Sequence, residues 1–277
     1  MRRCDPVAPS TARRPATLLT MPGRSPITLC GSISHHPAGL GAALHNAGYA
    51  ALALPFTYVP FGVRDLGDAV RGMRALGIRG LGVSMPFKVE IIPHLDELAP
   101  LARQIGAVNT VVNDDGLLTG HNTDAEGALA ALREEISPRG RRVLLLGAGG
   151  AARAVAHSLA ANGAHLRILS RNPERARELA LPLAAEWGDL SLLPQCEDFE
   201  ILVHSTPVGM VDHPGLLIPA QLLDPRRVIF DLVYKPPLTP LVLAARQRGC
   251  RVVTGERMLL HQAYRQFELY TGRPAPK

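Results

Sequence analysis

Two ionisable side chains in this sequence stand where an α/β protein places reactive groups. Lys88 ends the segment SMPFK after a short apolar run, and Asp124 begins a helical segment directly after Asn122 and Thr123. A lysine and an aspartate that meet in a cleft can pass a proton to or from a hydroxyl or a carbonyl. Taken singly, Lys88 fits a surface charge and Asp124 fits a carboxylate at a helix N-terminus. The pair has a chemical meaning only if the fold brings it together.

The scarcity of lysine sets Lys88 apart from the other basic residues. Of the 30 Lys and Arg residues only three are lysines, namely Lys88, Lys235 and the C-terminal Lys277. Arginine keeps its proton at accessible pH, whereas lysine can shift its pKa and exchange a proton. A lysine in so arginine-rich a chain therefore indicates a role that arginine cannot perform.

A glycine-rich turn at 147–152 predicts a dinucleotide site. The segment GAGGAA follows an apolar strand and opens a helix, which is the context that gives the pattern G-x-G-x-x-G/A its meaning. The first glycine permits the tight turn, the second lets the backbone approach a pyrophosphate, and the last alanine allows helix and strand to pack closely. The pyrophosphate would meet free N–H groups at the helix N-terminus. The cofactor-binding residues predicted in this loop are Gly147, Ala148, Gly149, Gly150 and Ala151.

The end of the following strand favours NADP over NAD. NAD sites usually carry an acidic residue about 20 residues after the glycine loop, but here the chain reads SRNPER over 170–175. Arg175 lies one helical turn beyond Arg171, and guanidinium groups bind a phosphate bidentately. Glu174 lies one residue too deep in the helix to be the usual ribose acid. We therefore assign Ser170, Arg171 and Arg175 to an NADP site.

Short apolar runs alternate with amphipathic segments from residue 26 onwards. This alternation predicts an α/β fold with parallel sheets and helices on both faces. The expected strands span 27–31, 51–56, 78–85, 142–146, 164–171, 200–205, 227–234 and 251–255, with a hairpin around the turn Asp115-Gly116. The expected helices span 37–48, 63–77, 96–106, 124–135, 151–162, 172–180, 239–249 and 257–272. Asn122 and Thr123 are the cap candidates of the helix over 124–135, and 136–142 is the clearest linker.

Length and composition exclude several classes of protein. The 277 residues suggest about two domains. The sequence contains no run of 18 apolar residues, so we expect no transmembrane helix. The four cysteines are scattered and form no CxxC pair, which argues against a disulfide framework and a metal-ligand cluster. Of the net charge of +6, residues 1–25 carry +4, so the body of the chain is nearly neutral. The neutral body and the 4% of aromatic residues disfavour nucleic-acid binding. We expect residues 1–25 to be a poorly ordered basic tail, either a targeting segment or sequence upstream of a start at Met21.

Eight segments, in order and with matching spacing, resemble the shikimate dehydrogenase family. They are MPFK (85–88), GAVNTV (106–111), NTDAEG (122–127), GAGGAARA (147–154), SRNPERA (170–176), STPVGM (205–210), FDLVYKPPLTPL (230–241) and GERMLLHQA (255–263). The resemblance implies two α/β domains with the active site in the cleft between them. A substrate domain would span 26–123 and a Rossmann-type NADP domain with a parallel sheet would span 124–256. The last helix, within 257–273, would pack back on the first domain.

The resemblance also implies roles for individual residues. Lys88 and Asp124 match the family's catalytic pair. Ser34, Ser84, Asn109, Tyr234 and Gln262 match substrate positions, and Gly255 and Met258 match the nicotinamide side. The implied activity is NADP-dependent interconversion of shikimate and 3-dehydroshikimate, in the chorismate pathway of aromatic amino acid biosynthesis. The implied setting is the cytoplasm, as a monomer or homodimer with a small-molecule substrate, no metal, and no nucleic-acid or membrane partner.

The motif that holds the substrate carboxylate in the family is altered here. The family opens with H-S-x-S-P-x-x-H-N, and its two serines bind the carboxylate. Anchoring this motif on Pro37 makes Ser34 the first serine and puts His36 in place of the second. Anchoring it on His45-Asn46 instead puts glycines at both serine positions. Both alignments stay open at the level of sequence.

Two further positions depart from the family pattern. The family's N-V-T before the P-F-K segment is Gly82-Val83-Ser84 here, and the asparagine that opens N-A-T-S-x-G-M is His204. The chain therefore looks like a divergent, shikimate-dehydrogenase-like member. Three functions follow: a dehydrogenase for shikimate, the same chemistry on quinate or an aminoshikimate, or a non-catalytic NADP-binding paralogue. Retention of both Lys88 and Asp124 argues against the last.

Overall fold

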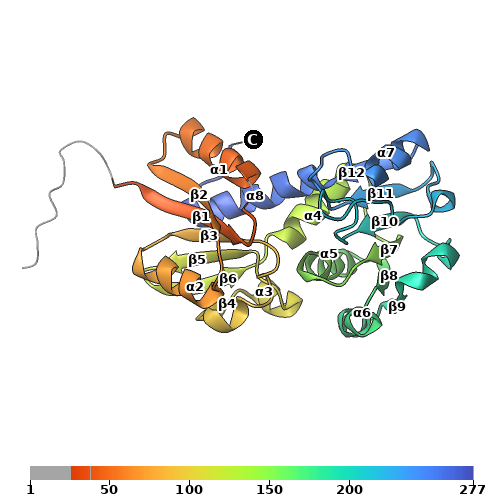
Figure 1. Cartoon of the computed structure of the whole chain (residues 1–277), viewed down its shortest axis with the longest axis horizontal. Helices are drawn as coiled ribbons and strands as arrows, with labels where there is room; N and C mark the ends of the chain where they lie inside the picture. The colour runs from red at the N-terminus through yellow and green to blue at the C-terminus, as the bar shows by residue number, and fades with distance from the viewer. Residues whose placement is uncertain (1–25, 38, 277) are drawn as a thin grey trace, which may run out of the picture.

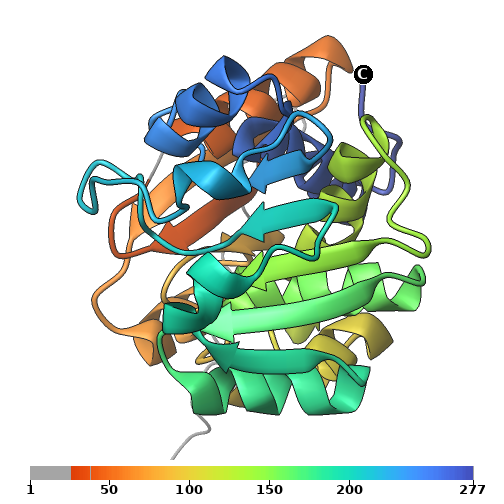
Figure 2. The ribbon, with the colours of Figure 1, turned by 90° about the vertical axis from the view of Figure 1, so that its right-hand side faces the viewer.

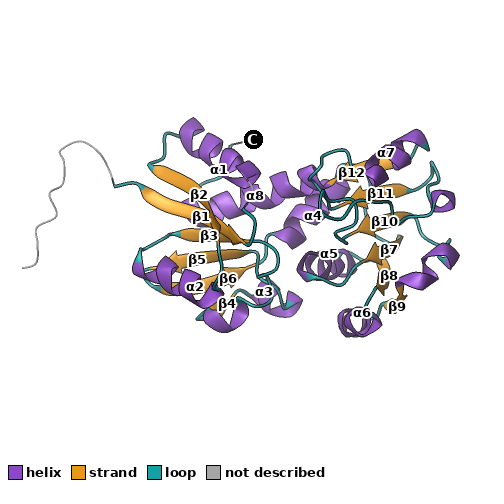
Figure 3. Cartoon of the chain, in the orientation of Figure 1, coloured by secondary structure: helices purple, strands orange, loops and turns teal. Residues whose placement is uncertain are grey.

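Two sheets stand side by side in this protein, each flanked by helices (Figures 1 and 3). The computed structural model describes residues 26–37 and 39–276, so the expected basic tail over 1–25 lies outside the described residues. The first sheet has the strand order β2-β1-β3-β5-β6-β4, and the second has the order β12-β11-β10-β7-β8-β9. The α/β fold expected from the alternating sequence pattern is confirmed.

The first sheet is mixed rather than wholly parallel. Its strands are β1 (Thr28–Ser34), β2 (Phe56–Gly62), β3 (Gly80–Val83), β4 (Glu97–Leu98), β5 (Thr110–Asp114) and β6 (Leu117–His121). β1 pairs in parallel with β2 and β3, whereas β5 runs antiparallel to both β3 and β6. The hairpin between β5 and β6 turns at Asp115 and Gly116, whose φ angles of 50° and 95° suit a tight two-residue turn.

Three helices pack with this sheet. One strand expected from the sequence, over 51–56, is wrong. The helices are α1 (Gly39–Ala51), α2 (Leu66–Ala75) and α3 (Pro100–Ile105). The apolar segment 51–56 does not form a strand, because α1 continues to Ala51 and the chain turns at Ala53, whose φ is 50°. The strand begins only at Phe56, where it pairs with β1. β2 lies at the edge of the sheet, where Pro60 is tolerated because an edge strand need not donate every N–H.

The second sheet is parallel throughout. Its strands are β7 (Arg142–Leu146), β8 (His165–Ser170), β9 (Glu186–Asp189), β10 (Ile201–His204), β11 (Val228–Asp231) and β12 (Arg251–Thr254). Figure 2 views these strands lying side by side. Leu145, Val203 and Phe230 are fully buried in its core. The edge strand β9 was not expected, because EWGD shows no apolar run.

Helices cover both faces of the second sheet. They are α4 (Asp124–Arg133), α5 (Gly150–Ala161), α6 (Pro173–Ala180) and α7 (Pro240–Gln247). Short 3-10 helices occur at Ile92–His94, Leu181–Leu183, Leu190–Gln195 and Ala220–Leu222. In the described part of the chain, no helix is both long and apolar enough to cross a membrane.

The last helix, α8 (Gly255–Thr271), returns to the first sheet. It lies along α4 and reaches α1 and β5 (Figure 1). A Cβ on Gly80 of β3 would lie 2.2 Å from the ring of Tyr270, so only glycine admits this ring. The expected packing of the final helix on the first domain is confirmed. The domain boundaries at 123–124 and 256–257 stay a prediction.

Candidate active site

Lys88 and Asp124 meet in the structure. The Nζ of Lys88 lies 2.5 Å from Oδ2 of Asp124, and the two side chains are only 15% and 7% exposed. Lys88 follows β3, and Asp124 is the first residue of α4. Because the pair is close and largely buried, water and salt screen its electrostatic attraction only weakly. The fold therefore supplies the juxtaposition on which the proton-transfer prediction depends.

The backbone of the segment 84–88 is fixed by its own hydrogen bonds. The N–H of Phe87 donates to the carbonyl of Ser84 over 3.0 Å, and the N–H of Val108 donates to the carbonyl of Lys88 over 2.7 Å. The peptide bond between Met85 and Pro86 is cis. The Phe87 side chain is buried, so it anchors the turn from which Lys88 projects.

Asn109 joins the Lys88–Asp124 pair to the last helix. Its Nδ2 lies 2.9 Å from Oδ1 of Asp124, 2.9 Å from Oγ1 of Thr123 and 3.3 Å from Oε1 of Gln262. Its Oδ1 accepts a hydrogen bond from the N–H of Thr123 at 2.7 Å. Both Asp124 oxygens therefore have partners. Three predicted site residues, Asp124, Asn109 and Gln262, form one buried cluster with Lys88.

Tyr234 lies close enough to this cluster for the charges of Lys88 and Asp124 to shift its pKa. Burial raises the pKa of its phenol, the positive charge of Lys88 lowers it, and the carboxylate of Asp124 raises it. The net direction is upward, so the phenol is a neutral hydrogen-bonding group at neutral pH. The assignment of Tyr234 to the substrate stays a prediction.

Gln266 is a polar group of this region that the sequence analysis did not identify. Its Nε2 donates to the carbonyl of Asn109 over 3.1 Å and to Oγ1 of Thr110 over 2.9 Å. It follows Gln262 by four residues and so shares its face of α8. That spacing of two glutamines on one helix face was the signal available in the sequence.

The serines predicted to hold substrate lie at the ends of β1 and β3. Ser34 ends β1 and is buried, and Ser84 is half-buried with its N–H on the carbonyl of Ile33. No bond from either hydroxyl to Lys88 or Asp124 occurs in the described residues. His36 is exposed. These serines do not join the hydrogen-bond network of Lys88 and Asp124 in the described part of the chain, and their substrate role stays a prediction.

Glycines open two positions near the expected carboxylate end. Added Cβ atoms on Gly39 and Gly41, in the first turn of α1, would meet nothing within 4 Å. A Cβ on Gly82 would instead lie 2.7 Å from the hydroxyl of Tyr58 and 3.4 Å from Nε2 of Gln266. The space beside Gly39 and Gly41 is therefore open, whereas Tyr58 fills the space beside Gly82.

The glycine loop has the geometry that a pyrophosphate requires. Gly147 has φ of 114°, and a Cβ there would lie 2.7 Å from the carbonyl oxygen of Ser205. Gly149 precedes α5, and nothing lies within 4 Å of the position of its Cβ. Ala148 is buried, and Ala151 is half-buried in the first turn of α5. The loop thus offers an open approach to the N-terminus of α5, as NADP requires.

The glycine loop also packs against Lys88. A Cβ on Gly150 would lie 3.0 Å from Cβ and 3.3 Å from Cδ of Lys88. The two predicted sites, one for the cofactor and one for the proton, therefore adjoin.

The end of β8 fits a 2′-phosphate. Ser170 is buried at the strand end, and Asn172 caps α6 by accepting hydrogen bonds from two backbone N–H groups. Arg171 and Arg175 are exposed, and neither forms an ion pair within the described ranges. Glu174 pairs with Arg177 at 3.2 Å instead. Two free guanidinium groups beside the nucleotide loop favour NADP.

Gly255 places the start of α8 against the loop after β11. A Cβ on Gly255 would lie 2.4 Å from the carbonyl oxygen of Leu232 and 2.8 Å from that of Val233. Met258, one turn later, is buried in the core of the second domain. The residues predicted for the nicotinamide side thus adjoin the loop that carries Tyr234.

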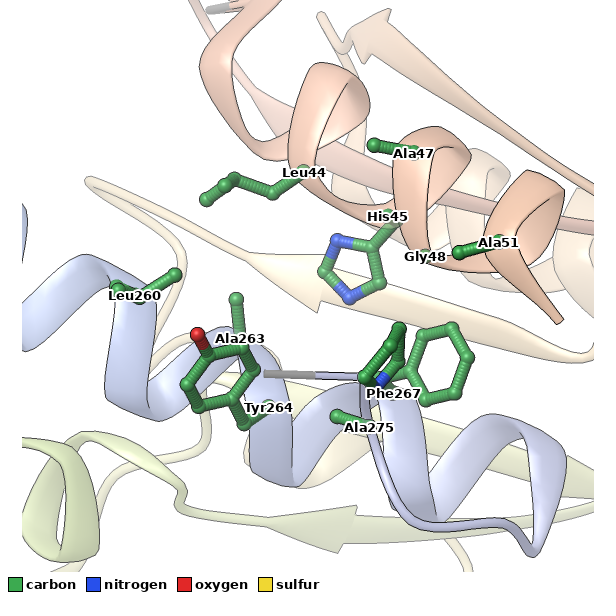
Figure 4. A pocket seen from close by; sticks show the side chains of 11 residues that line it. Leu44, His45, Ala47, Gly48, Ala51, Leu260, Ala263, Tyr264, Phe267 and Ala275 are labelled. Carbon is green, nitrogen blue, oxygen red and sulfur yellow. The ribbon is translucent and has the colours of Figure 1, made fainter.

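A mostly apolar hollow lies apart from this site. It has a volume of about 270 Å³ and lies between α1 and α8, where His45 points toward Phe267 and Tyr264 (Figure 4). Burial lowers the pKa of His45 to about 4. None of the predicted site residues lines it. No group of three His, Cys, Asp or Glu side chains able to hold a metal ion occurs over 26–37 and 39–276.

Three segments of this chain match shikimate dehydrogenase family models, and a curated relative matches 87% of the chain. Residues 35–111 match the shikimate dehydrogenase substrate binding domain, 129–209 match shikimate / quinate 5-dehydrogenase, and 255–277 match the shikimate 5′-dehydrogenase C-terminal domain. The shikimate dehydrogenase (NADP(+)) of Moorella thermoacetica is 42% identical over 259 residues, 87% of each chain.

Solved structures agree with the sequence comparison. Shikimate 5-dehydrogenase of Thermus thermophilus, in complex with NADP(H) and shikimate, superposes with a TM-score of 0.81 at 33% identity, covering 90% of this chain and 95% of that one. Quinate dehydrogenase of Corynebacterium glutamicum, in complex with NAD, has a TM-score of 0.81 at 32% identity, with 91% and 96% covered.

Proposed function

This chain belongs to the shikimate dehydrogenase family, and we propose that it is an NADP-dependent oxidoreductase that interconverts shikimate and 3-dehydroshikimate. The observation that carries the proposal is the 2.5 Å contact between Lys88 and Asp124, next to Gly150 of the nucleotide loop. A protein that only bound NADP would have no use for a buried proton-transfer pair at that place.

The residues present fit NADP. The open approach over Gly149 suits a pyrophosphate, and the unpaired Arg171 and Arg175 suit a 2′-phosphate. Ser170, Gly255 and Met258 complete the proposed cofactor site. When bound, NADP⁺ supplies the hydride acceptor for alcohol oxidation.

The chain's own residues handle the proton. Oxidation of a carbinol removes hydride from carbon and a proton from oxygen, and we assign that proton to the Lys88–Asp124 pair. Asn109 orients Asp124 through the 2.9 Å contact with Oδ1. Asn109, Gln262 and Tyr234 offer hydrogen bonds to the substrate's oxygens, and Ser34 and Ser84 are proposed to serve its carboxylate end.

A second substrate is favoured by the altered carboxylate end. Gly39, Gly41 and Gly82 carry no polar side chain where the family pattern has serine or asparagine. Quinate or an aminoshikimate, with a different pattern of ring substituents, could use the space at Gly39 and Gly41, whereas Tyr58 fills the space at Gly82. The likeness to a quinate dehydrogenase supports this candidate as well.

The test is a screen of the purified protein for NADPH formation, read by its absorbance. Shikimate, quinate and aminoshikimate are each offered with NADP⁺ and with NAD⁺. The proposal expects the fastest turnover with shikimate and NADP⁺. Preference for quinate or aminoshikimate would establish the second candidate, and no turnover with any of them would favour a non-catalytic NADP-binding protein.

The setting of the reaction follows from the same proposal. The enzyme would act in the chorismate pathway, in the cytoplasm, on a small molecule, and without a nucleic-acid or membrane partner. We propose that it works as a monomer or homodimer, with the substrate domain over 26–123 and 257–273 and the NADP domain over 124–256.

A further inference from the structure

A buried hydrogen-bond network joins the ends of β10 and β11. The register of these parallel strands places His204 directly beside Asp231. Nδ1 of His204 lies 2.9 Å from Oδ1 of Asp231, and its Nε2 lies 2.6 Å from Oγ1 of Thr206. His204 is 1% exposed and Asp231 is 0% exposed, so neither can contact a substrate directly.

Within this network, each hydrogen-bond donor faces an acceptor. Oδ2 of Asp231 accepts from the hydroxyl of Thr239 at 2.5 Å, and its Oδ1 accepts from the N–H of Val233 at 3.1 Å. Because a carboxylate only accepts, Nδ1 of His204 carries the hydrogen toward Asp231. Nε2 can then accept the hydroxyl proton of Thr206, so a neutral imidazole satisfies both neighbours. A buried polar network in which every group is paired is rigid.

The network fixes two loops that border the proposed cofactor site. Ser205 stands between His204 and Thr206, and its carbonyl oxygen lies 2.7 Å from the Cβ position of Gly147. The N–H of Val233 donates to Asp231, and the carbonyl oxygen of Val233 lies 2.8 Å from the Cβ position of Gly255. Gly147 and Gly255 of the cofactor site therefore pack against backbone segments whose positions are fixed by hydrogen bonds of His204 and Asp231.

We propose that His204 is a positioning residue for the cofactor site. It bridges Asp231 and Thr206 and thereby holds the turn 205–208 against Gly147 of the nucleotide loop. The asparagine found here in the family pattern has a shorter side chain, so His204→Asn is expected to lose the contact that Nε2 makes with Thr206. The inference rests on the proposed binding of NADP.

The test compares His204→Asn and Thr206→Val with the wild type. Calorimetry gives the Kd for NADP⁺, and steady-state assays give kcat and the KM for NADP⁺. Loss of one such hydrogen bond is expected to raise both Kd and KM about tenfold, with kcat at saturating cofactor within about twofold. Both changes remove the same contact, the hydrogen bond between His204 and Thr206. The Kd of the double variant for NADP⁺ should therefore not exceed the larger of the two single-variant Kd values.

A matched control separates positioning from a general loss of stability. His157 is a second buried histidine of the NADP domain, in α5, and its Nδ1 has no hydrogen-bond partner within the described residues. His157→Asn should leave the Kd for NADP⁺ unchanged. If His204→Asn does not fold, Thr206→Val still removes the bond at a half-buried residue.

The possible outcomes are distinct. Wild-type affinity for NADP⁺ in both Thr206→Val and His204→Asn overturns the positioning role, as does a double variant whose losses multiply. A fall in kcat without a change in Kd also overturns it. A wild-type protein that binds no NADP⁺ overturns the proposed function itself.

Discussion

Gly127 of α4 and Gln262 of α8 are packed so closely that no other residue fits at position 127. A Cβ on Gly127 would lie 2.8 Å from both the Cβ and the backbone nitrogen of Gln262. This approach of the two helices brings the Oε1 of Gln262 to within 3.3 Å of both Asn109 and Thr123. The glycine in NTDAEG is thus a packing requirement of the site.

Gly127→Ala is expected to force the two helices apart. Overpacking should lower the free energy of unfolding by about 1–3 kcal/mol, measured by chemical denaturation, and should raise the KM for the substrate because Gln262 moves. Gly72→Ala is the control, since Gly72 lies in α2 with nothing within 4 Å of its Cβ position. That change should stabilise by about 0.5–1 kcal/mol. Equal effects of the two changes would contradict the packing argument.

Arg171→Ala is expected to weaken NADP⁺ selectively. Loss of a charge-assisted bond to the 2′-phosphate should cost about 1.5–3 kcal/mol of binding free energy, while the Kd for NAD⁺ changes little because NAD⁺ lacks that phosphate. Titration of both cofactors against both proteins measures the difference. Equal weakening of NADP⁺ and NAD⁺ would remove the 2′-phosphate assignment from Arg171.

Glu134 should make a pH-dependent contribution to stability. Hydrogen bonds from Arg257, opposed by burial and aided by His261, lower the pKa of its carboxyl to about 2 from an ordinary value of 4.5. A lowered folded-state pKa stabilises the fold at pH above about 4.5, and the stabilisation is lost as the pH falls toward 2. Because the side chain is 34% exposed, we expect less than about 1 kcal/mol.

Thermal unfolding of Glu134→Gln tests this sign. Its Tm should lie below that of the wild type at pH 6, and the gap should close between pH 4.5 and 2. Glu135→Gln serves as the control, because Glu135 is exposed and forms no ion pair in the part of the chain described. A gap that widens as the pH falls would contradict the prediction.

Local turn chemistry and residue type were enough to predict much of the site. The glycine loop and the Asp115-Gly116 hairpin both depend on backbone angles that few residues adopt. The rarity of lysine and the start of a helix singled out Lys88 and Asp124, but only the family resemblance paired them in one role. At the glycine loop and the hairpin, the sequence signal and the structure agree because the determinants are local.

Apart from the return of the last helix to the first domain, which the family resemblance implied, several features that depend on contacts between distant segments were not predicted. The apolar run 51–56 looked like a strand, but pairing with β1 starts only at Phe56. The partnership of His204 with Asp231 arises from the register of two neighbouring strands 27 residues apart, and no local pattern encodes that register. Gln266 likewise acquires its role only when α8 packs on β5.

Lys88→Arg keeps the positive charge at position 88 but removes the ability of the side chain to exchange a proton. If Lys88 and Asp124 act as one proton-transfer unit, kcat should fall at least about 100-fold, while the Kd for NADP⁺ stays nearly unchanged. Asp124→Asn should act likewise. The double variant should be little worse than either single variant, as expected for residues that work together. Steady-state kinetics of the three variants and calorimetry with NADP⁺ measure these effects.

Lys235→Arg makes the same chemical change at an exposed lysine to which no role is assigned, and its kcat should match that of the wild type. A Lys88→Arg enzyme of near wild-type kcat would mean that Lys88 serves only as a positive charge that positions the substrate. The 2.5 Å contact with Asp124 would then be an orienting ion pair, and the proton would have to leave by another group. Tyr234, whose pKa is raised by burial and by Asp124, would be a poor substitute as a base. A large loss of kcat in Lys88→Arg with none in Lys235→Arg is therefore the result that assigns the proton to the pair.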